Sequence, residues 1–251
     1  MKLIVTKDYF LTSAKTAQII IEQVNQKPAS FIALPSGPTP VGMFEQLVLA
    51  YQSKKTDFSQ AHFMGVDEYF GLAKDHPDSV SHSLIERFFK PCSIRPDQIH
   101  LIDGAADPEE ECASINRYLD EVGGLDLIVT GIGLNGHLGY NEPAESLSPR
   151  VHVSGLGENT RLSLLKDFSD QTEIPSRIIT LGLADFLNAH KLVVLATGPS
   201  KSSVVRRLVQ AIGVSTFFPA SFVLLHRDAI LSVDEVAGKE LFPTNVPSDI
   251  D

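Results

Sequence analysis

The sequence predicts a doubly wound, Rossmann-like α/β domain in which helices cover both faces of a mostly parallel sheet. The first observation is a series of short, continuously apolar runs bounded by turn residues, which are typical of strands buried on both faces. The second is that amphipathic stretches separate most of these runs, as in repeated βα units. The third is the length of 251 residues, which is enough for one sizeable core.

The expected elements follow one another along a single domain, residues 1–251. Strands are expected over 2–5, 30–34, 62–66, 98–102, 125–130, 177–181, 191–197 and 229–233. Helical patterns lie between most of them, over 12–26, 40–53, 108–122 and 199–211. Residues 151–176 are more polar and have no strong period, so we expect a lid over the sheet edge. Residues 235–251 are rich in proline and acidic side chains and are expected to form a peripheral tail.

Composition and charge argue against several classes of protein. The formal net charge of −10 disfavours a nucleic-acid or anionic-membrane partner. No apolar stretch approaches the ~20 residues of a membrane span, and MKLIVTKDYF lacks the features of a signal peptide, so a cytoplasmic location is expected. The two cysteines, Cys92 and Cys112, belong to no metal-binding motif, so no metal site is expected.

Ligands of such sheets bind at the carboxyl ends of the strands, and the first strand end with a suitable sequence is LPSGPTP (34–40). Small residues allow backbone N–H groups to approach a ligand, and a helix N-terminus favours an anion. We therefore expect a phosphate site formed by Ser36, Gly37, Pro38 and Thr39, with Pro40 at the first position of the helix. The alternative is an ordinary βα turn in which Thr39 is the N-cap.

A second strand end, GVDEYFGL (65–72), carries two adjacent acids. One of Asp67 and Glu68 is expected to point into the crevice above the sheet, and Asp67 is the candidate proton-transfer group. The alternative is that Asp67 caps a turn.

The third strand end, GIGLNGHLGYNEP (131–143), combines glycines with a histidine and a glutamate. Its glycines fit the spacing GxGxxG, but a dinucleotide site would require a helix to begin at once within an early βαβ unit. Here His137, Glu142 and a proline follow instead, in the middle of the chain. A histidine five residues before a carboxylate in such a turn favours acid–base chemistry, although a structural histidine is the alternative.

The fourth strand end, ATGPSKSSVV (196–205), places Lys201 in the first turn of the next helix. A cation there opposes the helix dipole. An anionic ligand would compensate for this, so Lys201 is the candidate counter-charge of a phosphate.

In this order, the stretches PSGPTP, VDEYFGL, GIGLNGHLGYNEP and TGPSK resemble the glucosamine-6-phosphate deaminase/isomerase family, and the similarity extends from about residue 2 to residue 233. The resemblance implies a fold of the sugar-phosphate isomerase type and an enzyme that isomerises and deaminates a 2-amino-2-deoxy-hexose 6-phosphate. It implies proton transfer without a metal or organic cofactor, and a small sugar phosphate as the partner. Homo-oligomers are one expected form, because members of the family vary in oligomeric state.

Asn135 departs from the family pattern, in which an aspartate precedes the Gly-His pair. An aspartate would orient the imidazole and stabilise its protonated form, whereas an asparagine can only accept a hydrogen bond from it. Asparagine here, together with NGHLGYNEPAESL, GGLDL and PASFVLLH, resembles the galactosamine-6-phosphate branch more closely. Galactosamine 6-phosphate is therefore the favoured substrate and glucosamine 6-phosphate the alternative. The resemblance also implies that Arg161 or Lys166, in the expected lid, assists phosphate binding.

The mechanism implied by the resemblance assigns ring opening to His137, held by Asn135 or Glu142. Asp67 then carries a proton between C2 and C1, with its pKa raised from about 3.9 by partial desolvation and by Glu68. Two rival functions remain. A 6-phosphogluconolactonase-like hydrolase shares the fold and the glycine turn but does not need Asp67. A non-catalytic sugar-phosphate sensor does not need these acids and the histidine together.

Overall fold

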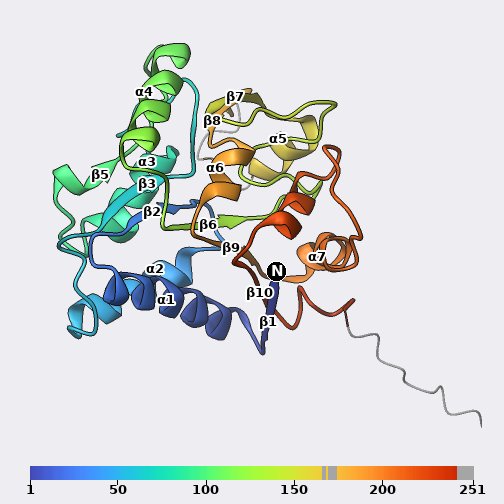
Figure 1. Cartoon of the computed structure of the whole chain (residues 1–251), viewed down its shortest axis with the longest axis horizontal. Helices are drawn as coiled ribbons and strands as arrows, with labels where there is room; N and C mark the ends of the chain where they lie inside the picture. The colour runs from blue at the N-terminus through green and yellow to red at the C-terminus, as the bar shows by residue number, and fades with distance from the viewer. Residues whose placement is uncertain (166–167, 169–173, 242–251) are drawn as a thin grey trace, which may run out of the picture.

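The computed structural model describes residues 1–165, 168 and 174–241 and contains two sheets (Figure 1). In the described part of the chain, the main sheet has seven strands in the order β1-β10-β9-β6-β2-β3-β5. All of its neighbouring strands are parallel. Its strands are β1 (Lys2–Thr6), β2 (Phe31–Leu34), β3 (His62–Gly65), β5 (Ile99–His100), β6 (Leu127–Gly131), β9 (Lys191–Ala196) and β10 (Ala229–Asp234).

Helices cover both faces of the main sheet, as the continuously apolar strands require. In β6, Leu127 and Val129 pack with α1 and α2, whereas Ile128 packs with α4 and α6 on the opposite face. Figure 1 shows α1 and α2 beneath the sheet and α4 and α6 above it. The bounds of these helices are α1 (Tyr9–Gln26), α2 (Val41–Gln52), α4 (Pro108–Glu121) and α6 (Leu183–Asn188). The predicted doubly wound α/β class is confirmed by this arrangement.

The predicted helix starts lie within a few residues of the observed ones. Two of the helices begin at an aspartate that acts as N-cap. Asp8 accepts a hydrogen bond from the backbone N–H of Leu11, and Asp107 accepts from those of Glu109 and Glu110. The other helical segments among the described residues are α3 (Val80–Leu84), the π-helix η1 (Ile85–Phe89), the 3₁₀ helix η2 (Pro96–Gln98), α5 (Glu158–Leu164), η4 (Pro199–Lys201), α7 (Ser202–Val209) and η5 (Pro219–Leu225).

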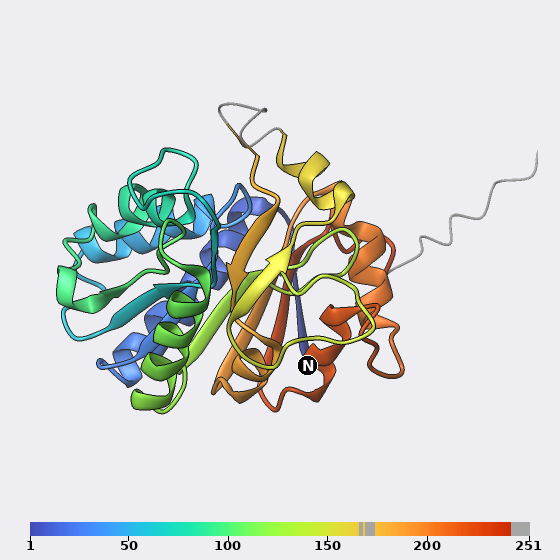
Figure 2. The same ribbon diagram turned by 90° about the horizontal axis from the view of Figure 1, so that it is seen from above.

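A second, antiparallel sheet has the order β4-β8-β7, formed by β4 (Asp67–Tyr69), β7 (His152–Gly155) and β8 (Arg177–Thr180). The strand predicted over 177–181 forms, but it lies in this sheet and not in the parallel one. Its two central residues, Ile178 and Ile179, are both fully buried, so its pattern is the same as that of a strand in the parallel sheet. Figure 1 shows β7 and β8 on the same side of the main sheet as α5 and α6, and Figure 2 shows the yellow β7 beside the light orange β8.

The predicted lid and the predicted peripheral tail both contain residues that pack against the rest of the molecule. Residues 151–176, expected to form a lid, include β7 and α5, and Leu164 of α5 is buried. Of the expected tail, residues 235–241 are described: Ala237 is fully buried, and Glu240 accepts a hydrogen bond from Ser202 at the start of α7. Residues 242–251 lie outside the described residues. The functions of the lid and the tail stay predictions.

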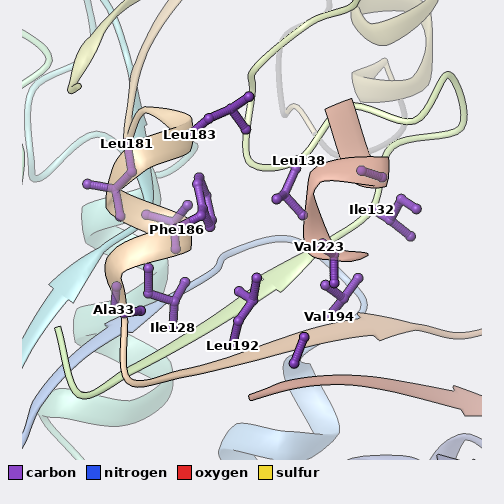
Figure 3. Close-up of a cluster of buried hydrophobic side chains, with 14 of the residues drawn as sticks. Ala33, Ile128, Ile132, Leu138, Leu181, Leu183, Phe186, Leu192, Val194 and Val223 are labelled. Atoms are coloured by element: carbon purple, nitrogen blue, oxygen red, sulfur yellow. The ribbon is translucent and has the colours of Figure 1, made fainter. Parts of the chain in front are cut away.

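The core beneath the carboxyl edge of the sheet anchors the third strand end. Ile132 and Leu138, on either side of the glycine turn, lie in the same buried cluster as Leu192 of β9, Phe186 of α6 and Val223 of η5 (Figure 3). Burying one such side chain contributes about 1.5–3 kcal/mol. The turn between them is thereby held against the core. None of the helices in the described part of the chain has the length and apolarity to cross a membrane.

Candidate active site

The four predicted site segments follow four neighbouring strands of the main sheet and lie at one edge of it. The order β9-β6-β2-β3 is continuous and parallel. The segments that follow these strands therefore leave the sheet at the same edge, where such folds bind ligands. These segments are 197–201, 132–143, 35–40 and 66–68.

The glycine turn after β6 is a tight loop closed by pairing of Ile132 with Leu138. Gly133 donates its N–H to the carbonyl of His137 at 3.0 Å. A Cβ on Gly133 would lie 2.4 Å from Nε2 of His137, so only glycine allows the imidazole to lie against the backbone here. Gly136 has φ +90° and its Cβ position is filled by the ring of Phe218. Gly133 thus allows the His137 ring to lie against the turn, and Gly136 allows the Phe218 ring to do so.

His137 and Glu142 form a hydrogen-bonded pair. Nδ1 of His137 lies 3.2 Å from Oε1 of Glu142, and both side chains are 15% exposed. Burial alone would raise the pKa of Glu142, but the hydrogen bonds from His137, Thr160 and Asn135 and the nearby His137 charge lower it below its ordinary value. An ionised carboxylate on Nδ1 orients the imidazole and stabilises its cation, which leaves Nε2 to exchange a proton with a ligand.

Asn135 supports this pair through the glutamate. Its Nδ2 donates to Oε2 of Glu142 at 2.6 Å, and its Oδ1 accepts the backbone N–H of His137 at 3.1 Å. Of the two holders predicted for the imidazole, the contact to the ring is therefore made by Glu142. The amide of Asn135 does more than accept a hydrogen bond, because it supplies a donor to the carboxylate.

Asp67 and Glu68 have different surroundings although they are adjacent in β4. Glu68 is fully buried and accepts the backbone N–H groups of Tyr69, Val80 and Ser81, so it binds N–H groups in the first turn of α3, whose N-cap is Ser79. Burial raises the pKa of Glu68, and these hydrogen bonds oppose the rise. In the described part of the chain, the acid of this pair that accepts backbone N–H groups is therefore Glu68 and not Asp67.

Asp67 is 7% exposed, and in the described part of the chain no hydrogen bond to its carboxylate is found. Burial, followed by the negative charge of Glu68, raises the pKa of Asp67 to about 8. These are the two causes expected from the sequence. A carboxyl group with a pKa in this range can gain and lose a proton near neutral pH.

Thr180 and Tyr140 connect Asp67 to the glycine turn. Asp67 pairs with Thr180 across the second sheet, and the backbone N–H of Tyr140 donates to Oγ1 of Thr180 at 3.2 Å. The ring of Tyr140 in turn stacks on that of His137 with 5.2 Å between centroids. Strand pairing, one hydrogen bond and one ring contact thus link the strand that carries the acid to the histidine.

The turn after β2 keeps polar groups available for an anion. Gly37 has φ +90°, and Ser36 and Thr39 are half-buried without a side-chain hydrogen bond to any described residue. The N-cap of α2 is Pro40, so Thr39 does not cap the helix, and the proline lies one position earlier than predicted. Pro38 is exposed, and its carbonyl accepts the backbone N–H of Val41 at 3.5 Å.

The turn after β9 makes hydrogen bonds to two other segments of the chain. Gly198, with φ +84°, donates its N–H to the buried carboxylate of Asp234 at 3.0 and 3.1 Å. Nζ of Lys201 donates to the carbonyl of Ile132 at 2.7 Å, and burial lowers the pKa of Lys201. The lysine therefore joins the β9 turn to the glycine turn, and an anion bound there would favour its charged form.

The two cations predicted in the lid are placed differently. Arg161 is exposed on α5, and its guanidinium donates to the carbonyl of Ile174 at 3.4 Å. Lys166 lies outside the described residues. Within the described residues, no group of three or more histidine, cysteine, aspartate or glutamate side chains is placed to hold a metal ion.

Comparison with known proteins identifies the family. The model of the glucosamine-6-phosphate isomerases/6-phosphogluconolactonase matches residues 11–231. The chain belongs to this family. A glucosamine-6-phosphate deaminase of Thermoanaerobacter sp. (strain X514) is 36% identical over 238 residues, 94% of each chain. A glucosamine-6-phosphate deaminase of Clostridium botulinum (strain Hall) is 35% identical over 242 residues, which cover 96% of this chain and 99% of that protein.

Solved structures of the family share the same fold. A monomeric glucosamine-6-phosphate deaminase superposes with a TM-score of 0.92 at 32% identity, covering 95% of this chain and 99% of that chain. The 6-phosphogluconolactonase of Trypanosoma brucei superposes with a TM-score of 0.75 at 19% identity, over 96% of this chain and 98% of that one, which is a likeness of fold alone. The family resemblance, the fold class and the expectation of an enzyme are confirmed. Homo-oligomer formation stays a prediction.

Sequence reasoning did not find two threonines of this site. Thr160 donates its hydroxyl to Oε1 of Glu142 at 2.6 Å, and Thr180 holds Tyr140. Thr160 lies in the segment without a strong period, and Thr180 is the last residue of a buried strand, so neither stands out in the sequence.

Proposed function

We propose that the protein is a glucosamine-6-phosphate deaminase, which converts glucosamine 6-phosphate and water to fructose 6-phosphate and ammonia. The observation that carries the proposal is the combination of a His–Glu pair, whose carboxylate is ionised, with a buried aspartate of raised pKa at one edge of the sheet. The names and high coverage of the relatives support the same activity.

The substrate phosphate binds between the turns after β2 and β9. Ser36, Gly37 and Thr39 offer hydroxyl and backbone N–H groups at the start of α2, and Pro38 shapes the turn. Lys201 supplies the counter-charge from the other side. The cost of burying its ammonium falls when a phosphate is bound, because the anion pairs with it.

Ring opening is carried out by His137. Its Nε2 moves the proton between the C1 hydroxyl and the ring oxygen, and Glu142 keeps the ring in one orientation with Asn135 behind it. The open-chain form has an aldehyde at C1 and an amine at C2.

Asp67 completes the isomerisation. It removes the proton from C2 while a proton from water is added to the C1 oxygen, which gives an enolamine. It then returns its proton to C1, which gives an iminium at C2 and a hydroxyl at C1. Water adds at C2, and the C–N bond breaks to release ammonia. Proton transfer by a positioned group contributes about 10²–10⁴-fold to such a rate. The raised pKa of Asp67, about 8, suits a group that must both take and return a proton.

Galactosamine 6-phosphate is the second candidate substrate, and the observation that favours it is Asn135 within NGHLGYNEPAESL. The two amino sugars differ only in the configuration of one hydroxyl group. The assay that tests the proposal measures ammonia release from each sugar phosphate, beside hydrolysis of 6-phosphogluconolactone. We expect kcat/KM to be highest with glucosamine 6-phosphate. Lactone hydrolysis without ammonia release would identify a lactonase, and sugar-phosphate binding without turnover would identify a sensor.

A further inference from the structure

Glu142 receives a third hydrogen bond, from a residue outside the glycine turn. Oγ1 of Thr160, in α5, donates to Oε1 of Glu142 at 2.6 Å. The same oxygen lies 3.2 Å from Nδ1 of His137, whereas the amide of Asn135 occupies Oε2. Thr160 is 5% exposed, so this contact is shielded from water.

The first turn of α5 packs directly on this carboxylate. A Cβ on Gly157, the N-cap of the helix, would lie 3.6 Å from Oε2 of Glu142. Glu142 is therefore held between two separate segments of the chain, the glycine turn and α5. A hydrogen bond to a charged group is stronger than one between neutral groups, so the hydroxyl of Thr160 restrains the carboxylate that orients the imidazole.

We propose that Thr160 is a positioning residue for the proposed deamination: its hydroxyl fixes Glu142 in the rotamer that holds His137 for ring opening. The inference rests on the proposed function and adds a residue from α5 to it. Thr160 contacts Glu142 and not the reacting atoms, and its effect on the reaction passes through the carboxylate.

Few titratable groups among the described residues surround Glu142, so a change in the pH dependence of kcat can be assigned to Glu142 and His137. In the glycine turn, His137 is the titratable group in contact with Glu142 in the described part of the chain. On α5, Glu158 and Arg161 flank Thr160; both are exposed, and Arg161 is directed to the carbonyl of Ile174. The hydrogen bond from Thr160 contributes to the lowered pKa of Glu142, so losing the hydroxyl raises that pKa.

The test replaces the hydroxyl while preserving shape. In Thr160→Val we expect kcat for ammonia release to fall on the order of tenfold with little change in KM. The acid limb of the kcat profile should move to higher pH, because Glu142 then becomes protonated at higher pH. Thr160→Ser restores the hydroxyl and should restore both quantities. The matched control is Ser163→Ala on the same helix, where the hydroxyl of an exposed serine donates to the carbonyl of Thr160.

A purely structural role predicts a different pattern. It would lower the melting temperature without moving the acid limb, and Thr160→Ser would be impaired as well. Either result, or an unchanged kcat in Thr160→Val, overturns the proposal. If Thr160→Val does not fold, Thr160→Ala removes the same hydroxyl without adding a methyl group, and it is read in the same way.

A measurement without turnover separates this proposal from the proposed function. The ring-nitrogen NMR shifts of His137 in the substrate-free protein should change in Thr160→Val and remain unchanged in Ser163→Ala. If the wild-type protein releases no ammonia, the proposed function fails, yet the NMR comparison still reports whether Thr160 positions the pair. Unchanged shifts in the valine variant would overturn the positioning role.

Discussion

Two carboxylates at the same edge of the sheet are both removed from water, yet their acidities change in opposite directions. Asp67, in the second sheet, is 7% exposed, and its pKa is raised to about 8 by burial and by Glu68. Glu142, in the glycine turn, is 15% exposed; burial acts on it in the same direction, but hydrogen bonds from His137, Thr160 and Asn135 lower its pKa.

The difference shows that hydrogen-bond donors, more than burial, separate the pKa values of Asp67 and Glu142. Without a hydrogen-bond donor among the described residues, Asp67 exchanges its proton near neutral pH and suits the transfer between carbon atoms. With several donors, Glu142 stays ionised and suits a permanent partner for an imidazole. A pair of acids with separated pKa values is the usual basis for dividing acid and base roles in an enzyme.

The largest expected effect comes from Asp67→Asn, which removes the titrating group. We expect kcat to fall about 10³-fold with KM nearly unchanged, because the phosphate contacts remain. Between pH 4 and pH 8 the folded protein holds a proton on Asp67 that the unfolded chain releases, so the wild type loses stability as pH rises through this window. The amide introduced by the substitution cannot ionise, so at pH 9 the variant should be more stable by a few kcal/mol, as measured by denaturant unfolding.

A surface aspartate provides the control for this experiment. Asp75 is exposed in the loop after β4, and Asp75→Asn should change neither kcat nor the pH dependence of unfolding. Turnover that persists in Asp67→Asn would remove the proton transfer from this residue. A stability equal to that of the wild type at pH 9 would show that the carboxyl group is not buried in the way described.

Glu142→Gln is expected to have the next largest effect, with the opposite sign for stability. It removes the charge that stabilises the imidazolium and places an amide near Nδ2 of Asn135, so kcat should fall about 10²-fold. A lowered pKa makes the folded state more stable above the ordinary pKa of a glutamate, and this contribution is lost as pH falls. The variant should therefore be less stable by about 1–3 kcal/mol at pH 7, with the difference shrinking below pH 4.

The contrast with Asp67→Asn is tested by unfolding both variants at pH 4, 7 and 9. Opposite signs at pH 9 are expected. If Glu142→Gln were stabilising there as well, burial would outweigh the donors at both positions, and the proposed division of roles would be wrong.

The sequence predicted the strands and the site segments that follow them, because the strands are continuously apolar and end in glycine, proline and charged residues. The parallel order of β9, β6, β2 and β3 then brings Lys201, His137, Ser36 and the segment of Asp67 to one edge. Burial and Glu68 were also the expected causes of the raised pKa of Asp67.

Tertiary packing determines what the sequence could not. β4 has three residues, DEY, which is too short for a periodic signal, and its partner β8 has the same apolar character as the strands of the parallel sheet. Glu68 turns inward because the start of α3 offers its N–H groups, and a loop separates α3 from β4 in the chain. Thr160 reaches Glu142 from a segment without a strong period. These contacts depend on how the elements pack against one another, and the sequence around each residue carries no pattern that predicts them.

Glu68→Gln is expected to have the smallest effect on turnover. It tests directly how much the charge of Glu68 contributes to the difference in pKa between Asp67 and Glu142. Three backbone N–H groups favour the ionised form of Glu68, and its charge is the second cause of the raised pKa of Asp67. Without that charge the pKa of Asp67 should fall. The limb of the pH profile of kcat that Asp67 governs should then move to lower pH. The value of kcat at the optimum should change by less than about tenfold. Losing the acceptor for the N–H that Oε2 accepts now should cost about 1–3 kcal/mol of stability. This cost should shrink as pH rises, because burial raises the pKa of Glu68 and the wild type loses stability above the ordinary pKa of a glutamate. A limb that does not move would mean that burial alone raises the pKa of Asp67, and Glu68 would then serve only to bind the N–H groups at the start of α3.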